Sequence, residues 1–208
     1  MTPQHAMRRG ALALGLFALV TAGSVTLTRA VTAERIAAHQ LAYQHRQLQE
    51  VLPGSLDTAP VQTVLEGTFS LPAPSLLGHR MPQEGWRVQQ GGDAVTILPV
   101  VTRQGYNGEI RLLVAIDQSG EITGVRVTHH QETPGLGDDI ERSRSDWITS
   151  FDGLSLQSLS PSGWAVRKEG GDFDSFTGAT ITPRAVINAV HDTLRYYHQQ
   201  LARQESAL

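Results

Sequence analysis

The sequence predicts an α+β fold: an antiparallel sheet with packed helices, preceded by one N-terminal transmembrane helix. Three patterns support this prediction. An uncharged apolar run occupies residues 10–28, apolar residues alternate along several segments between residues 86 and 128, and they recur at helical spacing after Pro183. The chain has 208 residues, of which 40% are hydrophobic. This is enough for the core of one domain and a short additional segment.

The composition excludes several classes of function. The net charge of −3 argues against a nucleic-acid-binding protein, which requires a basic surface. The sequence contains no cysteine, which excludes disulfides, thiolate metal sites and iron–sulfur ligation by this chain.

The N-terminal apolar run has the length of a membrane span, because as a helix it would measure roughly 28 Å. Arg8 and Arg9 precede it, so residues 1–9 are expected in the cytoplasm and the C-terminal part on the far side. A signal peptide cleaved near residues 31–33 is the alternative. A retained anchor is favoured, because the run is longer than a typical signal core and Arg29 lies before that site.

The residues after the span predict a stalk. A helix is expected from Thr32 to Val51, with Thr32 as its N-cap and only a thin apolar stripe along it. Pro53-Gly54 would end this helix. The expected organisation is therefore a stalk helix and linker over residues 29–58, followed by an extracytoplasmic domain over residues 59–208.

Segments with an apolar period of two predict an antiparallel meander. They are Trp86–Val88, Ala94–Val101, Glu109–Asp117 and Glu121–Thr128. The third segment would place four apolar residues on one face of the sheet, namely Ile110, Leu112, Val114 and Ile116. Pro99 favours an edge or a bulge for the second segment. Trp164–Arg167 is a candidate for a further strand.

The remaining elements are a loop and a C-terminal helix. Residues 129–141 contain a proline and two glycines, which predicts a loop that leads into a helix near Asp138. Thr182 followed by Pro183 is typical of a helix start, with a hydroxyl N-cap and a proline at the first helical position. This helix is expected to run from Pro183 to about Arg203.

The segment Thr177-Gly178-Ala179-Thr180 precedes that helix. A helix N-terminus offers free N–H groups and a partial positive charge, and a phosphate gains roughly 0.3–1 kcal/mol from the dipole. Gly178 and Ala179 allow a bulky group to approach the backbone closely. By itself, this short pattern is more often an ordinary capping loop.

A longer pattern resembles a known signature. Residues 174–180, DSFTGAT, resemble the flavinylation motif of FMN-binding domains, an Asp followed by Ser/Thr-Gly-Ala-Ser/Thr. Four stretches, the last of which contains this motif, resemble the G subunit of the Rnf (also called Rsx) electron-transport complex: HHQETPGLGDDIE, GYNGEIRLLV, SDWI and GGDFDSFTGATITPRAV. The resemblance covers most of the chain and is weakest between Pro53 and Gln90.

The resemblance implies a cofactor and its attachment site. Thr180 would carry FMN through a phosphoester bond, which a flavin transferase installs from FAD with magnesium. The signature residues around Thr180 are Asp174, Thr177, Gly178 and Ala179. A second loop would pack by the flavin ring, with Glu132 and Thr133 bonding its polar edge, Leu136 as an apolar contact, and Gly135 and Gly137 letting the backbone lie flat.

The resemblance also implies a role and a location. The chain would be a membrane-anchored flavoprotein that relays electrons within an Rnf/Rsx-type ion-translocating complex. Its partners would be the other subunits of that complex, with the flavin transferase during maturation. It would cross the bacterial inner membrane once, with its C-terminal domain in the periplasm. No side chains form a complete catalytic site, so we expect an electron-transfer subunit.

Other interpretations of the sequence are possible. The C subunit of sodium-translocating NADH:quinone reductase shares the FMN signature, but this chain is short for that family. A non-redox binding or sensor module is an alternative from another class, in which residues 177–182 only cap a helix.

A calcium loop at Asp172 and Asp174 lacks the expected ligand and glycine positions. The adjacent His129 and His130 would point apart in a strand, so no metal site is predicted.

Overall fold

A computed structural model of the chain describes residues 3–52, 67–90 and 92–201. The chain divides into two compact units, one that ends at Gln44 and one that begins at His45. Most of the first unit is a single helix. The second unit contains the sheet, the C-terminal helix and every cavity discussed below.

Helix α1, Pro3–Gln49, is continuous. Residues 10–33 are long and apolar enough to cross a membrane, and they include the predicted span. The predicted helix start at Thr32 is wrong. Thr32 lies inside α1, and its hydroxyl donates to the carbonyl of Thr28 at 2.7 Å, because nothing interrupts the helix between the span and the stalk. The predicted stop at Pro53-Gly54 lies outside the described residues.

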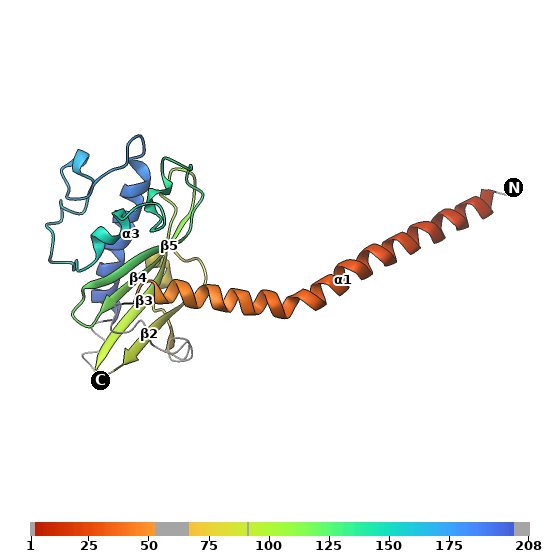
Figure 1. The fold of residues 1–208 in the computed structure, drawn as a ribbon, viewed down its shortest axis with the longest axis horizontal. Coiled ribbons are helices and arrows are strands. Elements are labelled where there is room, and N and C mark those ends of the chain that lie inside the picture. The colour runs from red at the N-terminus through yellow and green to blue at the C-terminus, as the bar shows by residue number, and fades with distance from the viewer. Residues whose placement is uncertain (1–2, 53–66, 91, 202–208) are drawn as a thin grey trace. The chain divides into compact units, whose positions relative to one another are not determined.

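Five antiparallel strands form one sheet in the order β1-β2-β3-β4-β5 (Figure 1). Their bounds are Thr68–Ser70, Glu84–Gln90, Asp93–Thr102, Ile110–Asp117 and Ile122–His129. The predicted meander is therefore confirmed for β2 to β5. The three-residue strand β1 lies within residues 59–82, for which the sequence predicts irregular structure with one or two short strands or turns. Its position could not be predicted, because a segment so short carries no measurable alternation.

The two faces of the sheet are buried against different elements. One face carries the predicted apolar set of β4, which packs with the C-terminal helix in the larger core cluster. The other face carries Leu113 and Ala115, which pack with Leu48 of α1 and with Val51 just after it. Gly124 makes this approach possible, because a Cβ there would lie 2.9 Å from the carbonyl oxygen of Val51. The last turn of the predicted stalk is thus part of the folded unit.

Pro99 lies in the middle strand of the sheet, so the expected edge position is wrong for β3 as a whole. The pairing between β2 and β3 nevertheless ends at Trp86 and Ile97, before Pro99 is reached. The carbonyl of Pro99 instead accepts a hydrogen bond from His79 Nε2 at 2.9 Å. Proline has no backbone N–H, but at Pro99 this loses no hydrogen bond to β2, because β2 does not pair with β3 at that position.

Helix α3, Ile181–Tyr196, continues as a π-helical turn, Tyr197–Leu201, and packs on β3 and β4 (Figure 1). The predicted helix is confirmed within the described residues, but its predicted cap is wrong. Thr182 lies in the first turn, fully buried, and Thr180 occupies the N-cap position. The hydroxyl of Thr182 has a partner elsewhere in the fold, which a local capping argument cannot reveal.

Short 3₁₀ helices connect these elements. They are η1 Pro74–Leu77, η2 Asp138–Ile140, η3 Trp147–Phe151 and η4 Arg167–Glu169. The helix expected near Asp138 is η2. The candidate strand Trp164–Arg167 is wrong, since only one isolated bridge joins Val166 to Phe173. Trp164 and Val166 are apolar because they belong to the core, and that burial does not require a sheet.

Candidate functional site

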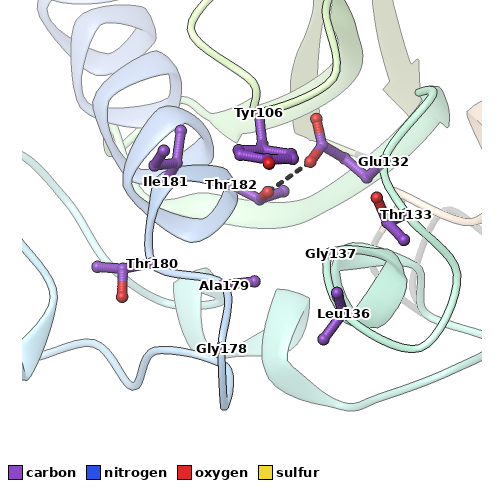
Figure 2. A pocket seen from close by; sticks show the side chains of 10 residues that line it. All are labelled: Tyr106, Glu132, Thr133, Leu136, Gly137, Gly178, Ala179, Thr180, Ile181 and Thr182. Carbon is purple, nitrogen blue, oxygen red and sulfur yellow. Dashed lines mark hydrogen bonds between the residues drawn. The ribbon is translucent and has the colours of Figure 1, made fainter.

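A cavity of about 240 Å³ lies where three segments of the second unit meet (Figure 2). Tyr106 comes from the loop between β3 and β4, and the loop after β5 adds four residues. The residues before and at the start of α3 complete the wall. Most of the predicted site residues line it together: Glu132, Thr133, Leu136, Gly137, Gly178, Ala179 and Thr180. The structure thus joins two loops that lie far apart in the sequence.

A tight turn positions the start of α3. The N–H of Ala179 donates to the carbonyl of Phe176 at 3.2 Å, and Gly178 has a φ of 82°. Glycine adopts this left-handed conformation at no steric cost. A Cβ at Gly178 would also come within 3.5 Å of Leu136 Cδ2, so the small residue leaves room at the wall.

Thr180 follows this turn at the N-cap of α3. Its carbonyl accepts the N–H of Arg184 at 3.3 Å, but its half-buried hydroxyl bonds no residue in the part of the chain that the structure describes. In Figure 2 the side chain of Thr180 points away from Glu132. A hydroxyl at a helix N-terminus with no partner and no capping role is well placed to be modified or to contact an anion.

Glu132 ties the three segments together. Its side chain is buried, and Oε2 accepts the hydroxyl of Thr182 at 2.6 Å while Oε1 accepts the backbone N–H of Asn107 at 3.1 Å. These donors come from α3 and from the β3–β4 loop. A Cβ at Gly137 would lie 2.9 Å from Glu132 Oε2, and a Cβ at Gly105 would lie 2.7 Å from Oε1. The two glycines therefore allow the backbone to close around the carboxylate.

His130 holds the loop after β5 in place. The N–H of Glu132 donates to His130 Nδ1 at 3.1 Å, and His130 Nε2 lies 2.6 Å from Glu141 Oε1. Because Nδ1 accepts, the ring proton is on Nε2 and is donated to the carboxylate. This hydrogen bond lowers the pKa of Glu141. His130 thus orients the backbone at Glu132.

The same loop closes on itself through Thr133, whose carbonyl accepts the N–H groups of Leu136 and Gly137, both at 3.1 Å. Gly135 has a φ of 76°, and its N–H donates to Asp138 Oδ1 at 2.6 Å. The turn leaves the side chain of Leu136 45% exposed at the cavity.

Two predicted site residues lie outside the cavity. Asp174 forms an exposed ion pair with Arg167 at 2.7 Å, and its carbonyl accepts the indole N–H of Trp147 at 2.8 Å. Thr177 is exposed within the turn that precedes α3. Neither side chain contributes to the wall, so their part in the signature does not come from lining this cavity.

Three lining residues were not predicted: Tyr106, Ile181 and Thr182. Tyr106 is 69% exposed and Ile181 is 43% exposed, so with Leu136 they form an apolar rim. The GYNG stretch was noticed only as part of the resemblance. Its position beside the α3 segment depends on the pairing of β3 with β4. Thr182 was assigned to capping, and no local pattern marks it as a partner of Glu132.

The cavity combines the features of a cofactor site. An apolar rim surrounds it, polar backbone and carboxylate groups fix its shape, and a helix N-terminus with small residues opens into it. Among residues 3–52, 67–90 and 92–201, no group of three or more histidine, aspartate or glutamate side chains could hold a metal ion. The helix N-terminus and the apolar rim suit the binding of an organic, phosphate-bearing group.

Comparisons with known proteins agree with this description. The family model named FMN-binding domain matches residues 105–195, which include the whole cavity wall. A second family model, named RnfG N-terminal region, matches residues 1–51. The crystal structure of the C subunit of the Na⁺-translocating NADH-quinone reductase from Parabacteroides distasonis covers 77% of this chain and 92% of its own, with a TM-score of 0.53. At 19% identity, it shows a shared fold only.

The relatives that match over nearly the full length are proteins named as the G subunit of an ion-translocating oxidoreductase complex. The Pseudomonas aeruginosa (strain UCBPP-PA14) protein is 46% identical over 98% of this chain and 96% of its own. The Shewanella loihica protein is 42% identical over 91% and 89%, and the Vibrio cholerae protein is 40% identical over 93% and 91%. The chain therefore belongs to the family of G subunits of ion-translocating oxidoreductase complexes.

Proposed function

We propose that the chain is a membrane-anchored flavoprotein that carries electrons through FMN attached covalently to Thr180. The observation that carries this proposal is the position of Thr180. Its hydroxyl has no partner among the described residues, and it stands at the N-terminus of α3, on the wall of a cavity that also contains the loop of Glu132. The match to the FMN-binding domain supports the choice of ligand.

The residues present fit such a group in three respects. The N-terminus of a 16-residue helix suits a phosphate, and Gly178 and Ala179 leave space beside it. The apolar side chains of Tyr106, Leu136 and Ile181 suit an aromatic ring. The volume of 240 Å³ is below the roughly 300–1,000 Å³ of typical ligand pockets. We therefore propose that the cavity encloses part of the flavin and leaves the rest accessible to redox partners.

FMN would supply one- and two-electron chemistry, and the chain would bind, orient and tune it. Glu132 would keep the β3–β4 loop and α3 at a fixed separation through its two hydrogen bonds. The turn at Gly178 would present Thr180 at the helix end. A covalent link would retain the flavin on a side of the membrane where FMN is not resupplied.

The membrane location and the partners of the chain are proposed from the apolar segment of the first unit and from the relatives. Residues 10–33 would anchor the chain in the bacterial inner membrane, and Arg8 and Arg9 favour a cytoplasmic N-terminus with the second unit in the periplasm. The relatives are named as subunits of an ion-translocating oxidoreductase complex. Its other subunits would be the electron donor and acceptor. A flavin transferase would install the FMN.

A gel experiment tests the attachment. The full chain is exported in cells that express a flavin transferase, and denatured samples are viewed under ultraviolet light after SDS electrophoresis. We expect a fluorescent band in the wild type and in Thr180→Ser, which keeps a hydroxyl, and at least a tenfold loss of fluorescence in Thr180→Ala. An equally fluorescent Thr180→Ala band would refute attachment at Thr180. A dark wild-type band, with the transferase active on a known acceptor, would favour a non-redox binding module.

A further inference from the structure

A second cavity, a groove of about 300 Å³, lies on the face of the sheet that the end of α1 covers in part. Pro99 and Leu113, which are paired across β3 and β4, form its floor with Val101. Residues at alternate positions share a face, so this floor continues the surface on which Leu48 packs. Within the described residues, the apolar face therefore extends beyond its helical cover.

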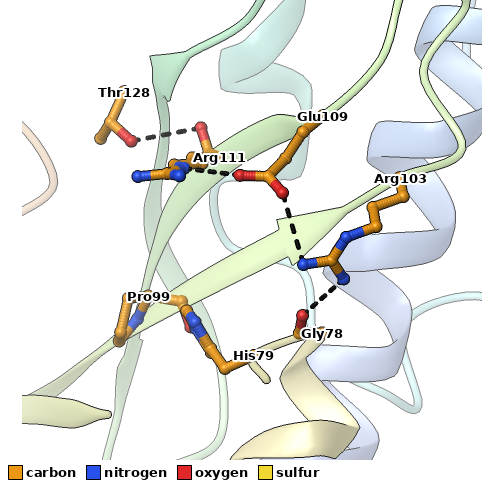
Figure 3. Close-up of polar contacts among 7 residues, drawn as sticks. All are labelled: Gly78, His79, Pro99, Arg103, Glu109, Arg111 and Thr128. Carbon is orange, nitrogen blue, oxygen red and sulfur yellow. Dashed lines mark hydrogen bonds and ion pairs between the residues drawn. The ribbon is translucent and has the colours of Figure 1, made fainter. Parts of the chain in front are cut away.

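Arginines surround this floor, and two of them are held in place (Figure 3). Arg103 donates from Nη1 to the carbonyl of Gly78 at 2.7 Å, and its Nη2 lies 3.3 Å from Glu109 Oε2. Arg111 donates from Nε to Glu109 Oε1 at 2.7 Å. The hydrogen bond from Arg111 lowers the pKa of Glu109. One carboxylate thus orients two guanidinium groups, which keep further donors for a partner.

Two further rim residues, Arg80 and Met81, are exposed. Arg80 has no ion pair or hydrogen bond to any described residue, and Met81 is 75% exposed. Three arginines and one glutamate line the groove, although the whole chain has a net charge of −3. Arginine and methionine are enriched at protein interfaces, and a basic patch on an acidic chain selects an acidic surface.

The groove adjoins the first cavity through one loop. In the segment between β3 and β4, Tyr106 lines the first cavity, whereas Arg103 and Glu109 line the groove. A partner held by these arginines would therefore be kept close to the proposed flavin. We propose that the groove docks an acidic segment of another subunit of the complex, with an apolar side chain over Pro99 and Leu113 and carboxylates on the arginines. This inference rests on the proposed function only where it places the partner near a flavin.

Photo-cross-linking tests the proposal in the assembled complex in membranes. A photoreactive phenylalanine analogue replaces Met81, and in the matched control it replaces Gln157, which is exposed and lines neither cavity. We expect a cross-link from position 81, but not from 157, to a peptide of another subunit that contains aspartate or glutamate. A cross-link to this chain itself, or no cross-link to any other subunit, would overturn the proposal.

Reversing the charge of one arginine tests whether the partner is held by the arginines or only lies close to residue 81. Arg80→Glu is added to the position-81 probe, and Arg195→Glu, at an exposed arginine of α3, serves as the control. We expect Arg80→Glu to lower the cross-link yield about fivefold at physiological salt, and Arg195→Glu to leave it unchanged. Equal yields in the two variants would refute a charge-selective interface. The ultraviolet band of each sample reports flavin attachment separately, so failure of docking is distinguishable from failure of the proposed cofactor.

Discussion

At the scale of single residues, Glu132 determines the geometry of the candidate site. Its carboxylate is taken out of water, which is unfavourable unless its oxygens accept hydrogen bonds. It accepts one from the N–H of Asn107 and one from the hydroxyl of Thr182. The second donor is fully buried, so it has no access to water as an alternative partner. One side chain thereby joins a strand loop, the loop after β5 and a helix end.

We expect Glu132→Ala to lower the free energy of unfolding by about 2–3 kcal/mol, because it leaves the buried hydroxyl of Thr182 without an acceptor and opens a small cavity. Flavin attachment at Thr180 should also decrease. Glu121→Ala, at an exposed glutamate, should change stability by less than about 0.5 kcal/mol. Urea unfolding of the solubilised chain, followed by tryptophan fluorescence, measures the stability of both variants. The ultraviolet gel band measures flavin attachment. Equal stabilities of the two variants would mean that Glu132 does not hold the site together.

At the scale of elements, the two faces of the sheet have different covers. Helix α3 packs on one face by its own apolar side, and its first turn brings Thr180 and Thr182 to the cavity. On the other face, Val51 reaches β5 so closely that its carbonyl accepts the hydroxyl of Thr123 at 3.3 Å. Gly124 is required at this contact because a side chain there would meet the backbone of Val51.

We expect Gly124→Ala to destabilise the second unit by about 1–3 kcal/mol, because the added Cβ overpacks against backbone that cannot rotate away. Gly135→Asn is the control, since the space around it is open and asparagine tolerates its positive φ. It should cost no more than about 1 kcal/mol. Thermal unfolding followed by circular dichroism compares the two variants. A Gly124→Ala protein as stable as the wild type would show that Val51, just after α1, does not pack on β5 as described.

At the scale of the whole molecule, the apolar helical segment and the folded second unit suit different surroundings. Residues 10–33 expose their apolar side chains, which only a membrane or another apolar surface satisfies. The second unit buries its own apolar residues in two clusters on either face of one sheet. The arginine pair at positions 8 and 9 favours one orientation of the span.

The absence of cysteine permits a direct test of orientation. We expect Ser150→Cys, at an exposed position of η3, to react with a membrane-impermeant maleimide in cells whose outer membrane is permeabilised. Gln4→Cys, on the other side of the span, should react only after the inner membrane is broken. The reverse pattern would show that the second unit is cytoplasmic, and the positive-inside argument would then not apply to this chain.

Local patterns were sufficient to predict most elements. The alternation of β3, β4 and β5, the long apolar run and the spacing in α3 are each properties of a few neighbouring residues. Two predictions of helix starts failed. At Thr182 a distant contact decided the outcome, because its hydroxyl bonds Glu132, whereas Thr32 lies inside a helix that continues from the span. The false strand at Trp164 failed for a related reason, because apolar residues that fill a core resemble those of a short strand.

By itself, the sequence determined that this chain has an apolar span, a meander sheet, a C-terminal helix and a threonine signature typical of flavin attachment. These are local features, which repeat along neighbouring residues or follow a short motif. Only the tertiary structure brought Tyr106, Glu132 and Thr180 to one cavity, left Asp174 outside it, and placed an arginine-lined groove beside it. The reason is physical: strand pairing and the two hydrogen bonds of one buried carboxylate set distances between segments that no local sequence pattern encodes.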